Sequence, residues 1–209
     1  MKNILKPIKI FILLLVCGGF ASQAQAQNGK NLYFNIDWQM NLPVQNDFAN
    51  RFSGWGAHGE FGYYVAPGVA VGAFVSYHTN NKYIDRATIS TGDNSAITTD
   101  QQHSIFQIPF GALVRFTPSR EGMVEPYIGA KLGTSYSEVS SHLNIYKVYD
   151  RGWGFYVSPE VGMTVYFTPE KQVGLHLSTY YNYSTQKSEV LNYDVDGLNN
   201  WGVRVGLAF

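Results

Sequence analysis

Apolar residues recur at every second position in eight separate segments, and this period of two is the feature that most constrains the fold. Successive side chains of a β-strand point to opposite faces, so such alternation predicts a strand with one apolar and one polar face. The segments are 32–40, 55–63, 69–77, 106–116, 128–136, 153–167, 173–183 and 201–209. No segment longer than a turn or two shows a helical period. The pattern predicts an all-β chain of eight antiparallel strands.

The connections between these segments alternate in length. Three short ones carry a proline (Pro67, Pro118 and Pro169), whereas the stretches at about 41–53, 78–104, 138–152 and 184–199 are long and polar. Short periplasmic turns and longer extracellular loops are the layout of an outer-membrane barrel. Charged residues are only 14% of the chain, against about 25% in typical soluble domains. We therefore expect an up-and-down transmembrane β-barrel rather than a soluble sandwich.

The N-terminal residues have the pattern of an export signal. Three lysines precede or flank the start of the apolar run 10–16, and Ala24-Gln25-Ala26 follows as a signal-peptidase motif. The run is shorter than the ~20 residues that a spanning helix needs, which argues against a membrane anchor. A lipid anchor at Cys17 is the other alternative. We expect a cleaved signal peptide at residues 1–26 and an outer-membrane β-barrel at residues 27–209, without cysteine.

Aromatic residues on the apolar faces fall at two heights. Those at the long-loop end of their strands are Trp38, Trp55, Tyr77, Tyr136, Trp153, Tyr183 and Trp201. Those at the opposite end are Tyr63, Phe116, Phe167 and Phe209. Two such bands match the two membrane interfaces, whereas a protein core has no reason to place every tryptophan at one rim. We expect outer-membrane lipid to surround the barrel.

The opposite face of the strands is rich in glycine and polar residues. We expect eight of its residues to form an interior polar network: Asp37, His58, Glu60, Arg115, Lys131, Glu160, His176 and Arg204. Strand order suggests that Arg204 neighbours Asp37 and that Lys131 neighbours Glu160. The interior of an eight-stranded barrel is just wide enough for side chains, and buried charges persist only when paired. A plugged interior is expected, with a narrow polar pore as the alternative.

The C-terminal strand ends in an aromatic residue, with apolar residues at every second position: Val203, Val205, Leu207 and Phe209. In its layout the whole mature chain, residues 27–209, resembles the eight-stranded outer-membrane barrels of Gram-negative bacteria, the OmpX/OmpW-like and OmpA-barrel-like families. The resemblance implies that these four residues are an assembly signal, read by the barrel-assembly machinery as a transient partner. It also implies residence in the bacterial outer membrane.

Residues that could carry chemistry are few. His176 and Ser178 share a face and Glu189 follows them, which resembles the His-x-Ser pair of barrel enzymes that deacylate lipid A. The pair points inward and lies near the turns, away from lipid A in the outer leaflet, so we expect no catalytic site. The five histidines lack metal-ligand spacing, although His78, His103 and His142 lie in or beside the outer loops. No metal, cofactor or nucleic acid is expected.

Two prolines, Pro109 and Pro159, interrupt otherwise regular strands. Proline cannot donate to a β-ladder, so each is either a tolerated irregularity or a weak point through which an apolar ligand passes sideways. The long polar loops, notably 79–104 and 184–200, are candidates for binding an extracellular ligand or partner protein. We expect a non-enzymatic structural or surface-interaction barrel. The alternatives are a small transporter of a small or apolar solute and, third, a lipid A-modifying enzyme.

Overall fold

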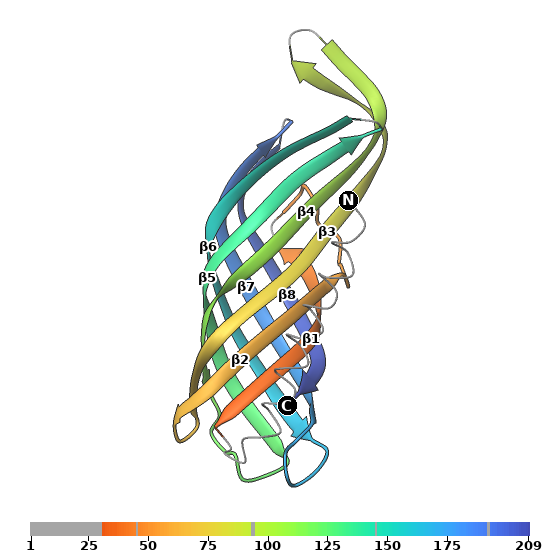
Figure 1. Cartoon of the computed structure of the whole chain (residues 1–209). Helices are drawn as coiled ribbons and strands as arrows, with labels where there is room; N and C mark the ends of the chain where they lie inside the picture. The colour runs from red at the N-terminus through yellow and green to blue at the C-terminus, as the bar shows by residue number, and fades with distance from the viewer. Residues whose placement is uncertain (1–30, 45, 93–94, 145, 192) are drawn as a thin grey trace, which may run out of the picture. The chain divides into compact units, whose positions relative to one another are not determined.

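The computed structural model describes residues 31–44, 46–92, 95–144, 146–191 and 193–209. Eight antiparallel strands close into one barrel in sequence order, which confirms the predicted fold (Figure 1). They are β1 (Leu32–Val44), β2 (Gly56–Ala66), β3 (Val69–Gly92), β4 (Ser95–Phe116), β5 (Val124–Leu143), β6 (Tyr146–Tyr166), β7 (Gly174–Val190) and β8 (Tyr193–Ala208). The ladder between β1 and β8 closes the ring. The expected signal peptide lies outside the described residues.

Most of the stretches expected as long loops are strand extensions instead. The β3–β4 ladder continues to Gly92↔Ser95, the β5–β6 ladder to Leu143↔Tyr146 and the β7–β8 ladder to Val190↔Tyr193. Of the four expected long loops, only the one between β1 and β2 is largely irregular in its described residues. The inward residues of these extensions are buried but mostly polar, for example Gln101, Gln186 and Ser188, so no apolar period of two marks the extensions in the sequence. The described residues of 78–104, 138–152 and 184–199 therefore form extended hairpins, where loops are expected from the sequence.

The β3–β4 hairpin extends furthest past the wall (Figure 1). In the described ladders, residues 87–92 pair only with residues 95–99, because β5 pairs with β4 no further than Gln101↔Leu143. A register shift between Ile84 and Ala87 separates this part from the barrel. Such irregularities bend a strand and increase its twist. We call residues 87–92 and 95–99 the ribbon.

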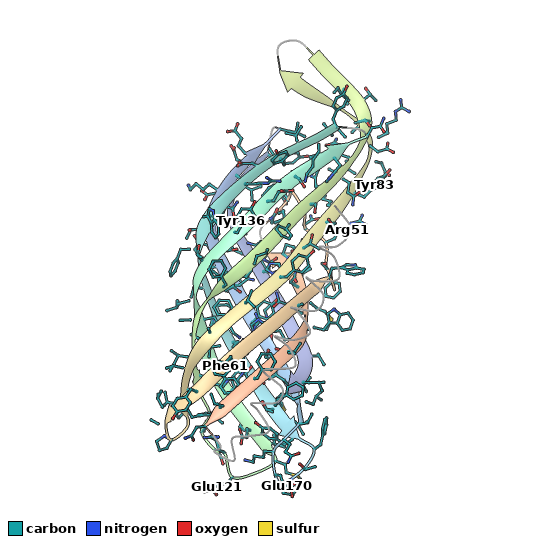
Figure 2. All side chains as sticks on the ribbon, in the orientation of Figure 1. Arg51, Phe61, Tyr83, Glu121, Tyr136 and Glu170 are labelled. Carbon is teal, nitrogen blue, oxygen red and sulfur yellow. The ribbon has the colours of Figure 1, made fainter. Side chains whose placement is uncertain are left out.

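The alternation places apolar side chains outside and polar ones inside. All four tryptophans are more than half exposed on the outer surface. Figure 2 shows Phe61 and Tyr136 on the outside of the wall at different heights, with Glu121 and Glu170 at the end of the short turns. We call that end the turn end and the opposite end the loop end. Among the described residues no helix is long and apolar enough to cross a membrane.

Inward glycines let neighbouring strands approach closely on the β2–β5 side. Gly72 of β3 lies opposite Gly62 of β2. A Cβ at Gly72 would overlap the backbone carbonyl oxygen of Phe61, whereas a Cβ at Gly59 would meet nothing within 4 Å. Gly72 and Gly59 lie on paired strands. Alanine at each position therefore compares a Cβ that would overlap the backbone with one that would meet nothing within 4 Å.

Gly72→Ala is expected to lower the free energy of unfolding by about 1–3 kcal/mol, because a backbone carbonyl cannot move aside as a flexible side chain can. Gly59→Ala is expected to leave stability near that of the wild type. Urea unfolding of the protein in lipid vesicles measures both. Equal midpoints for the two variants would show that the close approach at Gly72 does not constrain the barrel.

Candidate functional site

Glu60 lies at the centre of an ion network at mid-height in the lumen. Its Oε2 forms an ion pair with Lys131 Nζ at 2.8 Å, and its Oε1 accepts a hydrogen bond from Arg115. Lys131 also bonds to Glu160, whose Oε2 accepts from Arg204 Nη1 at 2.5 Å. These five side chains are at most 5% exposed. The wall strands therefore hold a continuous chain of alternating charges across the lumen.

The formal charges of this network cancel. Among the described residues, its carboxylates are Asp37, Glu60 and Glu160, and its permanent cations are Arg115, Lys131 and Arg204. His58 lies between Glu60 and Ser76, with its Nδ1 2.6 Å from the Ser76 hydroxyl. Buried charge is tolerated only when it is compensated and hydrogen-bonded. Each charged side chain here has an ion-pair partner, although Asp37 Oδ2, Arg115 Nε and Arg204 Nη2 have no hydrogen bond to the described residues.

Aromatic and histidine side chains fill the lumen on the turn side of Glu60. His176 Nδ1 lies 2.7 Å from Asp37 Oδ1, and its Nε2 lies 2.6 Å from the Tyr127 hydroxyl. A neutral ring that donates from Nδ1 and accepts at Nε2 satisfies both contacts. The Arg115 guanidinium packs between Tyr127 and Tyr33, at 3.7 and 4.3 Å from their ring centroids. This packing closes the turn side of the lumen.

A chain of hydrogen bonds, which we call the relay, runs from Arg204 through Gln39 and His78 to Gln107, toward the loop end. The chemical type of each group decides which atom donates in each bond. An arginine can only donate, and Arg204 Nε donates to Gln39 Oε1 at 2.9 Å. The Gln39 amide nitrogen therefore faces His78 Nδ1, at 3.2 Å, and donates to it. His78 Nε2 is then the protonated nitrogen and donates to Gln107 Oε1 at 2.6 Å. The relay therefore fixes the orientation of Gln107.

Residues 46–49 close the loop end, and we call them the lid. Asn46 Oδ1 accepts from the backbone N–H of Phe48, which holds the local turn. Phe48 and Ala49 are buried in an apolar cluster with Ile105, Val139, Val190, Val195 and Leu198. The Phe48 ring stacks on His103 with centroids 4.1 Å apart, and its carbonyl lies 3.0 Å from His103 Nδ1. Burial in this cluster lowers the pKa of His103.

The structure brings together all eight residues expected in the interior, with one change of partner. Arg204 was expected beside Asp37, but Arg204 lies opposite Gln39 in the β1–β8 ladder and Asp37 lies opposite Gly206. Arg204 therefore bonds to Gln39 and Glu160. Lys131 does contact Glu160. The network also includes Gln39, Gln107 and His78, the last of which was expected in or beside an outer loop, and the same alternation places all three inward.

The expected aromatic bands lie on the outer surface of the barrel. At the loop end, Tyr136 and Trp153 are cross-strand partners with ring centroids 5.1 Å apart. The other members of this band are Trp38, Trp55, Tyr77, Tyr183 and Trp201, all exposed. At the turn end Tyr63, Phe116, Phe167 and Phe209 are exposed. Val203, Val205 and Leu207 also face outward, and Phe209 pairs through its backbone with Phe34.

The residues weighed for catalysis do not assemble. His176 and Ser178 are buried in the lumen, and the His176 ring is occupied by Asp37 and Tyr127. Glu189 is exposed on the far extension of the same strand. Of the loop-end histidines, His78 lies in the relay, His103 under the lid and His142 on the surface. In the described ranges no three His, Cys, Asp or Glu residues are placed to hold a metal ion.

The two strand prolines coincide with interruptions in the ladders. The β3–β4 register passes from Val75↔Phe110 to His78↔Gln107, so Pro109 faces a gap on the β3 side. The β6–β7 register passes from Val157↔Tyr183 to Glu160↔Tyr180, which leaves Pro159 in a gap on the β7 side. The pairing resumes without a shift in both cases. The prolines flank β5, as expected, but each interruption lies on the side of the proline away from β5.

Comparison with known proteins places this geometry in a family. A family model described as "Outer membrane protein beta-barrel domain" matches residues 11–209. The structure of neisserial surface protein A aligns with a TM-score of 0.54 and 17% identity, covering 85% of this chain and 95% of that chain. OprG from Pseudomonas aeruginosa aligns with a TM-score of 0.47 and 12% identity, over 87% and 97% of the two chains. These identities show a shared fold only. A search of curated proteins gives no match.

Removing one charge of the lumen network is expected to destabilise the barrel more than removing a pair. Lys131→Met or Glu160→Gln alone leaves unbalanced buried charge and is expected to lower the free energy of unfolding by about 3–5 kcal/mol. The double variant restores neutrality and is expected to be clearly more stable than the sum of the single effects predicts.

Unfolding of the wild type, both single variants and the double variant in lipid vesicles gives the coupling energy. The exposed pair Lys187–Asp196, 3.0 Å apart, is the matched control. The same cycle at that pair is expected to show no coupling above error. Additive effects at Lys131 and Glu160 would contradict the interpretation of the network as a compensated unit.

Proposed function

The chain belongs to the outer membrane protein β-barrel domain family, and from this premise we propose that it is a non-enzymatic barrel with a sealed lumen that acts through its outer surface. Its place is the bacterial outer membrane. The observation that carries the proposal is the lumen itself, where side chains fill the space from Tyr33 to Phe48. A barrel sealed in this way offers its loop end, rather than a channel, to the surroundings.

Three features support the placement in the membrane. The two exposed aromatic bands match the positions of the membrane interfaces, with lipid between them. The outward residues of β8, from Val203 to Phe209, have the pattern of an assembly signal for the barrel-assembly machinery. The pattern of residues 1–26 supports export through a cleaved signal peptide. Together these features orient the turn end toward the periplasm and the ribbon toward the outside.

The ribbon is the element best suited to contact a partner. It pairs only with itself in the described ladders, so it adds little to barrel closure. Its side chains include Thr88 and Thr98, whose hydroxyls lie 2.8 Å apart across the strands. Cross-strand side-chain contacts such as this threonine pair stabilise a two-stranded unit. A partner protein or an extracellular polymer is the expected ligand.

The folded protein is expected to conduct no stable unitary current in a planar bilayer, because the lumen charges of the described strands are paired with one another rather than lining a water path. Single-channel recording of the wild type and of Lys131→Ala tests this expectation. A stable wild-type current that Lys131→Ala alters would show that the interior charges line a pore and would overturn the sealed lumen.

Replacing residues 87–99 with a two-residue Asn-Gly turn is expected to leave barrel unfolding unchanged and to abolish attachment to partners. Cells that carry the full or shortened chain are compared for retention on immobilised proteins and polysaccharides. Shortening the β7–β8 hairpin serves as the matched control at the same end. Retention that survives loss of the ribbon would contradict its role in binding.

A small transporter of an apolar or small polar solute is the second candidate function. The interruptions at Pro109 and Pro159 support it, since each removes ladder hydrogen bonds between two wall strands. Opening the wall at such a point would release a solute sideways into the membrane without passage through the sealed lumen. The proposal ranks second because the register is unchanged on both sides of each interruption.

If the wall opens at these points, replacing both prolines with valine is expected to slow solute uptake, because valine supplies the missing N–H donors. Uptake of a fluorescent apolar probe by vesicles that contain wild-type or doubly substituted protein measures the effect. Protein-free vesicles set the baseline. Unchanged uptake in the valine variant would contradict lateral transport.

A further inference from the structure

Two basic side chains share one carboxylate on the outer wall of the barrel, where β5 pairs with β6. Glu138 Oε2 accepts a hydrogen bond from Arg151 Nε at 2.6 Å, and Glu138 Oε1 accepts one from Lys147 Nζ at 2.5 Å. The ring centroid of Tyr149 lies 4.6 Å from Arg151 Cζ and 5.2 Å from Lys147 Nζ. We call these four residues the basic cluster. Its two cations and one carboxylate leave one uncompensated positive charge.

The basic cluster lies just past the loop-end aromatic band and on the same face of the wall. In the β5–β6 ladder Glu138 lies opposite Arg151, and Tyr136↔Trp153 of the band is the neighbouring outward pair. Residues two positions apart on a strand point to the same face, so the cluster points outward with these two rings. Figure 2 shows Tyr136 on the outside of the wall. The Arg151 side chain is 51% exposed.

Strand geometry gives the height of the two positive charges above the aromatic band. Arg151 lies two residues past Trp153, which is about 7 Å along the strand and about 5 Å along the normal for a tilted strand. Lys147 lies further out on β6, but its Nζ reaches back to Glu138. Band aromatics mark the edge of the hydrocarbon, and the headgroup layer beyond it is about 5–7 Å thick. Both positive charges therefore lie in the headgroup layer.

The matching positions on the other strands carry no charge. Two residues past the band, the outward residues of β1, β3, β4, β7 and β8 are Met40, Thr79, Ser104, Thr185 and Asn199. On β7 the next outward residue is Lys187, and the single carboxylate of Asp196 on β8 neutralises it. Among the described strands, excess positive charge in the headgroup layer is thus confined to β5 and β6. This confinement points to a local binding site rather than to a general property of the wall.

The donors of the basic cluster suit a phosphate group. Arg151 donates to Glu138 through Nε, and its two Nη groups form the fork that binds phosphate oxygens in pairs. An ammonium group has three N–H donors, and Lys147 uses one of them for Glu138. The Tyr149 ring packs against both cations and holds them on one side of the carboxylate. Lipid phosphates are the anions found at this depth of a bilayer, so they are the matching ligand.

We propose that the basic cluster binds the phosphate group of an anionic lipid in the outer leaflet. Arg151 and Lys147 donate to the phosphate oxygens, and the exposed ring of Trp153 lies beside the start of the acyl chains. The inference rests on the proposed placement in the membrane and adds a specific lipid site to it. A barrel that inserts normally but shows no lipid preference would refute the site and leave the placement intact.

Native mass spectrometry of the full barrel tests the proposal, after release from nanodiscs with equal amounts of phosphatidic acid and phosphatidylcholine. The wild type is expected to retain phosphatidic acid in preference. Arg151→Gln is expected to reduce this preference about fivefold, the contribution of one basic residue at a charged bilayer surface. Adding Lys147→Gln is expected to reduce it further. Lys187→Gln, at the exposed pair with Asp196, is the matched control and is expected to change nothing.

Glu138→Gln gives a test of opposite sign. It removes the carboxylate that competes with the lipid, so it is expected to raise the preference for phosphatidic acid, whereas a cluster that only stabilises the hairpin would show no such gain. Inorganic phosphate is expected not to displace the lipid, and displacement would show a site for free anions instead. Equal lipid preference in the wild type and the Arg151→Gln, Lys147→Gln double variant would overturn the proposal. A chain that fails to enter nanodiscs would overturn the membrane placement together with it.

Discussion

Closure of the β-ladder is the constraint on which the rest of the structure depends. Lipid offers no hydrogen bonds to a backbone, so a spanning sheet must pair every strand on both sides. Here β1 meets β8 over ten residue pairs, from Asn35↔Ala208 to Val44↔Asn199. A closed wall has an outside that must be apolar and an inside that lipid never reaches. The period of two in the sequence is the direct consequence of this requirement.

Inside the barrel, stability depends on the pairing of opposite charges rather than on apolar packing. Six permanent charges share the lumen, and each carboxylate has a cation or a histidine within bonding distance. Arg204 has a special role because guanidinium groups only donate. Its contact with Gln39 fixes the direction of every hydrogen bond up to Gln107. A charge at mid-height thereby determines which polar atoms the loop end presents.

The two ends of the barrel differ in what they offer. The turn end is closed by aromatic rings around Arg115 and by short connections. The loop end has extended hairpins, the ribbon and a lid held by one aromatic ring and a few polar contacts. Elements with few buried contacts open most readily. We therefore place the proposed binding function at the loop end, on the ribbon, which pairs only with itself in the described ladders.

The sequence by itself determined the eight strands, the direction in which each side chain points and the heights of the aromatic bands. All of these follow from local alternation, which needs no knowledge of distant residues. Only the tertiary structure decided which inward residues meet, because the stagger between strands places Arg204 opposite Gln39 rather than Asp37. The tertiary structure also decided that Phe48 closes the lumen. Phe48 lies in an irregular segment, so no alternation in the sequence predicts where its side chain points. Similarly, the polar extensions pair through backbone hydrogen bonds, which side-chain patterns do not record.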